Sequence, residues 1–153
     1  MERIASFTVD HNKLLPGLYL SRRDGEVTTF DLRFKRPNTG DLLTNSEMHS
    51  AEHLIATLLR NSPEKDAVIY FGPMGCQTGF YFLFDSRRLT DSEAIGLLQR
   101  VFNAAAAYDG AMPGSSAAEC GNFANLSVKE GRRVCAYYAG VIERWTAEQL
   151  QYA

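Results

Sequence analysis

Alternating apolar and polar residues mark the first predicted strand. The segment EVTTFDLRFK covers residues 26–35. Its apolar residues Phe30, Leu32 and Phe34 alternate with the polar residues Asp31 and Arg33. A period of two sends successive side chains to opposite faces of a sheet. The pattern therefore predicts a half-buried strand whose polar face, with Arg33, points away from the core.

Two capping boxes predict where helices begin. Thr44 is followed by Glu47, and Thr90 by Glu93, a spacing at which side chains satisfy the free backbone N–H groups of a first helical turn. Turn and breaker residues end both helices. The expected helices run from Thr44 to about residues 61–63, from Thr90 to about 109–110, and from about 127 to 145, with a short further helix at TAEQLQ.

Two aromatic-rich apolar runs, AVIYF and GFYFLFD, flank the glycine-rich loop GPMGCQT. Short apolar runs around such a loop are typical of an antiparallel strand pair. The predicted element order is therefore β-α-β-β-α-α, a single-domain α+β fold with an antiparallel sheet and helices packed on one face.

Composition limits the partners. The chain has 153 residues, of which 45% are hydrophobic, and a net charge of -2 from 16 basic and 18 acidic residues. Neither nucleic acid nor an anionic membrane surface is indicated by that balance. The first residues, MERIASFTVDHNK, lack an apolar signal segment, and every apolar run is too short to span a bilayer, so we expect a soluble cytoplasmic protein with small-molecule or protein partners.

The segment HSAEH carries the most informative chemistry. His49 and His53 are four residues apart, so on a helix both imidazoles can reach one metal ion, with Glu52 beside them as a neighbour of bound water or substrate. A helix with two surface histidines is the simpler alternative. A catalytic metal usually has a third protein ligand, and spacing alone does not say whether Cys76 or Cys120 provides it.

The remaining polar candidates carry weaker signals. Cys135 falls inside the last predicted helix, where a free cysteine is typically a small buried hydrophobic residue. Ser6 and His11 are ordinary polar residues near the start of the chain. Arg33 on a polar strand face is usually solvated, although a guanidinium is well suited to bidentate recognition of a carboxylate.

Five separated motifs together resemble one family. SFTVDHN, FDLRFKRPN, HSAEHL, GPMGCQTG and ECGN occur in the order and at about the spacing found in S-ribosylhomocysteine lyases of the LuxS type. The resemblance covers nearly the whole chain, although the segment between His11 and Arg33 is several residues shorter than is usual in that family. It implies that residues 1–153 form a single metal-dependent lyase domain.

The resemblance also implies the activity and the roles of the candidates. These enzymes cleave S-ribosylhomocysteine, an intermediate linked to the methionine cycle, to homocysteine and 4,5-dihydroxy-2,3-pentanedione, the autoinducer precursor of bacterial quorum sensing. One divalent metal per chain is expected, Fe(II) natively, with zinc or cobalt as replacements. The implied metal ligands are His49, His53 and Cys120, the implied proton-transfer residues are Glu52 and Cys76, and Ser6, His11 and Arg33 fall on substrate-pocket positions at a homodimer interface.

Two other functions are compatible with parts of the sequence. The order His-x-x-Glu-His is also the signature of inverzincin peptidases, but those enzymes take a downstream glutamate as third ligand and are much longer chains. A metal-stabilised binding module without turnover is the second alternative, and it leaves Cys76 without a role.

Overall fold

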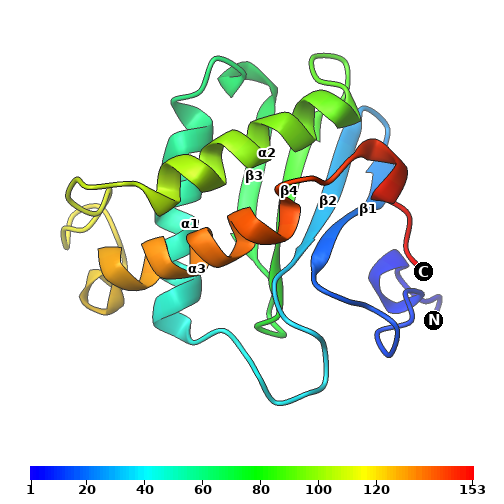
Figure 1. The fold of residues 1–153 in the computed structure, drawn as a ribbon, viewed down its shortest axis with the longest axis horizontal. Coiled ribbons are helices and arrows are strands. Elements are labelled where there is room, and N and C mark those ends of the chain that lie inside the picture. Colours follow the sequence, from blue (N-terminus) through cyan, green and yellow to red (C-terminus); the bar gives the residue numbers. More distant parts are fainter.

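The computed structural model describes residues 1–153 as a four-stranded antiparallel sheet in the order β1-β2-β4-β3, with helices across one face (Figure 1). The strands are β1 (Gly17–Asp24), β2 (Val27–Arg33), β3 (Val68–Pro73) and β4 (Gly79–Asp85). The helices are α1 (Asn45–Arg60), α2 (Asp91–Ala106) and α3 (Val128–Ile142). The predicted α+β class with helices on one face is confirmed.

The sequence analysis missed strand β1. It pairs with β2 from Gly17 opposite Arg33 to Asp24 opposite Val27, so only Gly25 and Glu26 form the turn between them. Gly25 has a φ of 58°, a left-handed conformation that glycine adopts without steric cost. The register slips between Leu20 and Arg22, and strand β1 therefore lacks the regular alternation that identified β2.

Strand β2 is buried on both faces, which contradicts the prediction that its polar face is solvated. Asp31 is 2% exposed and Arg33 is 3% exposed. The two ends of the chain lie on this side of the sheet. Leu20 donates its N–H to the Leu150 carbonyl, and the Tyr152 hydroxyl donates to Asp31. Ser6, Val9 and His11 of the N-terminal segment line a small cavity with Asp31 and Arg33. No local pattern predicts a cover that comes from such distant segments.

The helix boundaries largely follow the capping signals. Both capping boxes form, with the N–H of Glu47 donating to Thr44 Oγ1 and that of Glu93 to Thr90 Oγ1. Helix α1 ends at Arg60 as expected, whereas α2 ends at Ala106, three to four residues before its predicted limit, and α3 ends at Ile142, three residues before its limit. The short C-terminal helix is present as a 3-10 turn over Ala147–Gln149.

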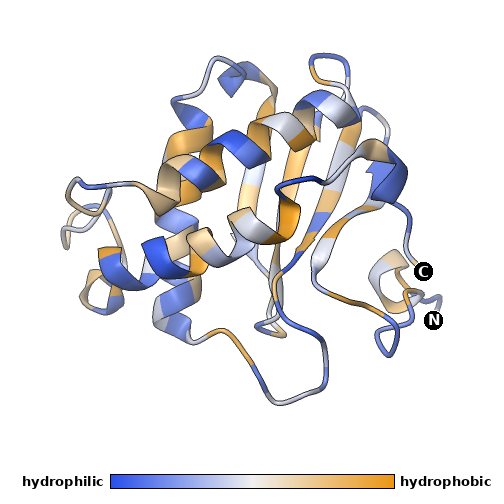
Figure 2. Ribbon diagram, in the orientation of Figure 1, coloured by the Kyte–Doolittle hydropathy of each residue, from blue (hydrophilic) through white to orange (hydrophobic).

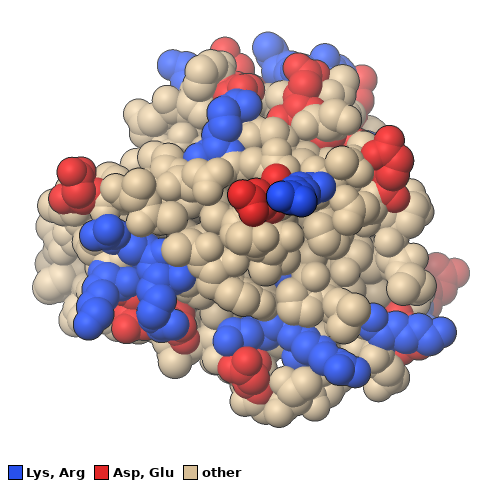
Figure 3. Space-filling view, in the orientation of Figure 1, with Lys and Arg blue, Asp and Glu red and all other residues tan.

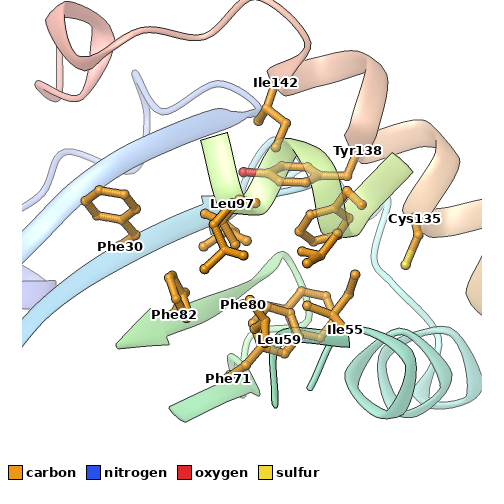
Figure 4. Close-up of a cluster of buried hydrophobic side chains, with 14 of the residues drawn as sticks. Phe30, Ile55, Leu59, Phe71, Phe80, Phe82, Leu97, Cys135, Tyr138 and Ile142 are labelled. Carbon is orange, nitrogen blue, oxygen red and sulfur yellow. The ribbon is translucent and has the colours of Figure 1, made fainter. Parts of the chain in front are cut away.

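One hydrophobic cluster of 30 buried residues lies between the helices and the sheet. Apolar and polar residues alternate along the turns of the helices (Figure 2), as expected of helices that bury one side. Phe34 stacks on Tyr138 of α3 with ring centroids 4.1 Å apart. Cys135 lies in the same cluster (Figure 4) and is fully buried, and burial raises the pKa of its thiol to about 12, which confirms it as a small core residue.

Charged side chains of both signs are distributed over the helical face (Figure 3). Basic residues gather over the first turns of α3, where Arg133 lies 2.7 Å from Glu47 of α1 and 2.5 Å from Glu130. The contact with Glu47 joins α3 to the first turn of α1, the helix that carries the two histidines. No helix is both long and apolar enough to cross a membrane.

Candidate metal centre and catalytic cysteine

His49 and His53 of helix α1 both use ring nitrogen Nδ1 in a hydrogen bond, which leaves Nε2 as the second nitrogen of each ring. His53 Nδ1 lies 2.8 Å from the Pro113 carbonyl oxygen, which can only accept, so Nδ1 carries the proton. His49 Nδ1 lies 2.5 Å from Asn125 Oδ1, and the Asn125 amide in turn donates to Asn45. Each Nε2 is therefore left as a lone-pair donor, the tautomer that a metal ion requires.

Cys120 supplies the third donor atom. Its Sγ lies 3.3 Å from His49 Nε2, and the ligand atoms of His49, His53 and Cys120 all lie within 4.8 Å of one another. These partly buried groups form a His₂Cys set, which suits zinc, iron or cobalt. The arrangement could hold a metal ion, as the sequence predicted for the two histidines.

The loop before Cys120 is shaped around His53. Gly114 has a φ of 66°, and a Cβ there would lie 3.2 Å from two atoms of the His53 ring, so only glycine lets the backbone pass so close without displacement. Farther along, the Glu119 carboxylate accepts from both the N–H and the hydroxyl of Ser116, and those hydrogen bonds lower the pKa of Glu119. The Cys120 N–H donates to the Ser116 carbonyl, which holds the main chain of Cys120 close to Ser116.

Glu52 is partly buried on α1 and is not one of the three grouped donors. An inverzincin requires a glutamate as third ligand, whereas the third grouped donor here is the cysteine Cys120. The donor set therefore disfavours the peptidase alternative.

Cys76 belongs to a different region, the loop between β3 and β4. It is exposed, its Sγ lies 3.0 Å from the Thr78 hydroxyl, and Arg33 Nη1 lies 3.9 Å from the same sulfur. A cavity of about 450 Å³ opens beside it, lined by His11, Pro37, Asn38, Gly40, Leu42, Cys76 and Thr78. None of the three grouped donors lines this cavity. Within one chain, the His₂Cys group and Cys76 therefore lie in two separate regions.

Arg33 is not free to recognise a carboxylate from a ligand. Its Nε and Nη2 donate to the two oxygens of Asp31 at 3.1 and 2.7 Å, and Nη1 donates to the Thr78 hydroxyl at 2.7 Å. Although burial by itself lowers the pKa of Arg33, the Asp31 carboxylate raises it and the net shift is upward. Arg33 is therefore a fixed cation beside Cys76.

The structure brings Ser6, His11 and Arg33 together, while their place in a substrate pocket at a homodimer interface stays a prediction. They line one small cavity with Val9, Ser21, Asp31, Tyr81 and Tyr152. His11 Nδ1 lies 2.9 Å from the Val9 carbonyl, which leaves its other ring nitrogen available. Sequence reasoning missed Asp31, Tyr81 and Tyr152; the position of Asp31 two residues before Arg33 on one strand face was the only available signal.

The fold and donor set define a class: a small α+β domain with a His₂Cys group suited to a transition metal and a second cysteine beside a buried arginine. The model of the S-ribosylhomocysteinase (LuxS) family matches residues 4–149. S-ribosylhomocysteine lyases of Finegoldia magna and Desulfotalea psychrophila are 41% and 42% identical to the chain, each alignment covering 99% of both proteins. The lyase of Clostridium beijerinckii is 44% identical over 84% of the chain and 83% of that protein. The chain belongs to the S-ribosylhomocysteinase (LuxS) family.

Proposed function

We propose that this protein is an S-ribosylhomocysteine lyase, which cleaves its substrate to homocysteine and 4,5-dihydroxy-2,3-pentanedione, the precursor of a bacterial quorum-sensing autoinducer. The observation that carries the proposal is the convergence of His49, His53 and Cys120 in a chain that matches the family from residue 4 to residue 149. The reaction moves the sugar carbonyl toward the thioether and then eliminates the thiol. It needs charge stabilisation at oxygen and proton transfer at carbon.

The grouped donors are proposed to hold one divalent ion. Fe(II) is the proposed native metal, with zinc and cobalt as alternatives that a His₂Cys set also accommodates. When bound, the ion would supply Lewis acidity that stabilises negative charge on the sugar oxygens. The hydrogen bonds to Asn125 and Pro113 support this role, because they hold both imidazoles in the ligating tautomer.

Cys76 is proposed to take and return protons at the sugar carbons. A thiolate is the reactive form, and the Arg33 cation 3.9 Å from Sγ is placed to stabilise its negative charge. Glu52, beside the two histidines on α1, is proposed to transfer protons at the sugar oxygens and to protonate the departing sulfur of homocysteine. Ser6, His11 and Arg33 are proposed to border the bound substrate.

We also propose a cytoplasmic homodimer with its active sites at the interface. Within one chain the cavity of Cys76 excludes the His₂Cys group, so a second copy can complete each site. Exposed apolar side chains lie beside this region, since Phe7 follows Ser6 and Leu42 lines the cavity next to Cys76. A second copy that completes the site would cover them. The three cysteines are free thiols, as in a reducing compartment.

The test is incubation of the purified, metal-loaded protein with S-ribosylhomocysteine while the released thiol is titrated. Release of homocysteine is the expected result, with no cleavage of unstructured peptides. Absence of thiol release, together with peptide hydrolysis that disappears in a Glu52→Gln variant, would favour the peptidase.

A further inference from the structure

A buried polar network lies behind Cys76. Asp31 and Arg33 are adjacent on one face of β2 and almost fully buried. Tyr152, near the end of the chain, donates its hydroxyl to Asp31 Oδ2 at 2.7 Å. None of the proposed proton transfers uses Asp31 or Tyr152, so their burial needs another explanation.

The carboxylate of Asp31 determines how the guanidinium is oriented. A guanidinium is planar and rigid, and binding through Nε and Nη2 fixes the direction of Nη1. Asp31 engages those two nitrogens. Nη1 is consequently directed at the Thr78 hydroxyl and at the Cys76 sulfur. Without that carboxylate, the arginine could rotate about its side-chain torsions and face elsewhere.

Tyr152 closes this network from outside the sheet. The main chain beside it is held by the hydrogen bond from Leu20 to Leu150, and its ring stacks on Tyr19 with centroids 5.1 Å apart. Burial, reinforced by Asp31, raises the pKa of Tyr152 above its ordinary value. The hydroxyl therefore keeps its proton at working pH and remains a donor to Asp31.

Other titratable groups lie near Cys76, and their charges would affect any pH-dependent measurement of its reactivity. Tyr81 lies close enough for the charges of Asp31, Arg33 and Cys76 to act on it. His11 borders the Cys76 cavity from the N-terminal segment. The groups around the thiol are thus Arg33, Asp31, Tyr81, Tyr152 and His11.

We propose that Asp31 and Tyr152 are positioning residues, which hold the Arg33 guanidinium so that Nη1 faces the Cys76 sulfur. The C-terminal segment then contributes to the reactivity of a cysteine that lies far from it in the sequence. The inference rests on the proposed function only in taking Cys76 as the base in turnover; the orientation itself can be tested without substrate.

The decisive variant is Tyr152→Phe, which removes one hydroxyl and retains the ring that stacks on Tyr19. The matched control is Tyr70→Phe, because Tyr70 is an exposed tyrosine on β3. Metal-loaded proteins are treated with iodoacetamide across a range of pH, and alkylation of each cysteine is followed by peptide mass spectrometry. In Tyr152→Phe we expect Cys76 to be alkylated about threefold more slowly at neutral pH, a fraction of what an opposite charge this close does to an acid.

The same experiment gives the overturning results. A loss of thermal stability in Tyr152→Phe with an unchanged pH profile of Cys76 alkylation would show a structural role only and overturn the inference. An equal slowing in Tyr70→Phe would do the same. Asp31→Asn would also remove a negative charge close to the thiol, which by itself favours the thiolate, so Tyr152→Phe decides the test.

Turnover separates this inference from the proposed function. Slower alkylation of Tyr152→Phe with reduced kcat and unchanged KM supports both. Slower alkylation with unchanged kcat supports the positioning and removes Cys76 from the rate-limiting proton transfer of the proposed function. Unchanged alkylation overturns the positioning whatever the activity.

Discussion

The two loop cysteines differ in what surrounds the sulfur. Cys120 Sγ lies 3.3 Å from His49 Nε2 and accepts the N–H of Asn122, so its hydrogen-bond partners are one ring nitrogen and one backbone amide. Cys76 lies beside the Arg33 cation and the Thr78 hydroxyl. The first group brings together three donor atoms that could bind one metal ion. The second group already contains a cation, Arg33, beside an exposed sulfur.

Replacing a donor in the His₂Cys group has the largest expected effect. In His53→Ala we expect the metal content to fall from about one ion per chain to near zero, and lyase activity with it, because two donors do not make a stable transition-metal site. Metal analysis of the purified protein is the measurement. His11→Ala is the control for metal content, since His11 lies in the other region; full occupancy in His53→Ala would refute the ligand assignment.

Replacing Cys76 tests the second region, where the sulfur lies beside Arg33. Cys76→Ala should keep the metal and lose turnover by at least about 10²-fold, which is what a positioned acid or base usually contributes. It should also stop exchange of the sugar's carbon-bound hydrogens with deuterated water, because abstraction precedes elimination. Normal turnover of a metal-loaded Cys76→Ala protein would remove the cysteine from the mechanism.

The part of the candidate site that depends on local sequence was predictable, whereas the part that depends on tertiary contacts was not. The capping box at Thr44 and the spacing of His49 and His53 are written in one helix, so the sequence predicts where both imidazoles point. Cys120 and Cys76 both lie in loops of small residues, and spacing could not assign them. Arg33 was expected in solvent because its strand alternates, and the segments that bury it are the chain's two ends.

The fold shows the same division. Strand β2 and the capped helices follow from local periodicity and short motifs. Strand β1 was missed, since its burial pattern changes along its length from buried to exposed and its register is irregular. Pairing with a neighbour, and not its own pattern, makes it a strand.

Mixing two inactive variants tests whether the two regions meet across a dimer. A chain with His53→Ala and a chain with Cys76→Ala each lack one half of the chemistry. If each site combines the His₂Cys group of one copy with Cys76 of the other, half of the randomly mixed dimers carry one intact site, and about a quarter of wild-type activity should return. No recovery in a confirmed heterodimer would place both halves in one chain.

A smaller effect is expected from the hydrogen bond behind His49. Asn125→Ala removes the acceptor that holds the proton on His49 Nδ1 and leaves all three donor atoms in place. Metal affinity should fall by about 10- to 100-fold, the usual cost of losing such an outer partner. Competition with a chelator measures the change, and Asn122→Ala, which keeps the backbone N–H beside Cys120, is the control.

The third cysteine provides the smallest effect and a reference for the other two. Cys135 is buried in the core, and its pKa is raised from 9.0 to about 12 by burial alone. Between those values the unfolded chain loses the thiol proton while the native chain keeps it, so unfolding is favoured as pH rises. Above pH 9 the free energy of unfolding of the wild type should therefore fall more steeply with pH than that of Cys135→Ala. The difference between the two slopes should be at most about 1.4 kcal/mol per pH unit. Both proteins share the buried tyrosines, whose contribution cancels in the comparison of denaturation curves. Equal slopes would mean that the Cys135 thiol is ionised as easily in the native protein as in the unfolded chain.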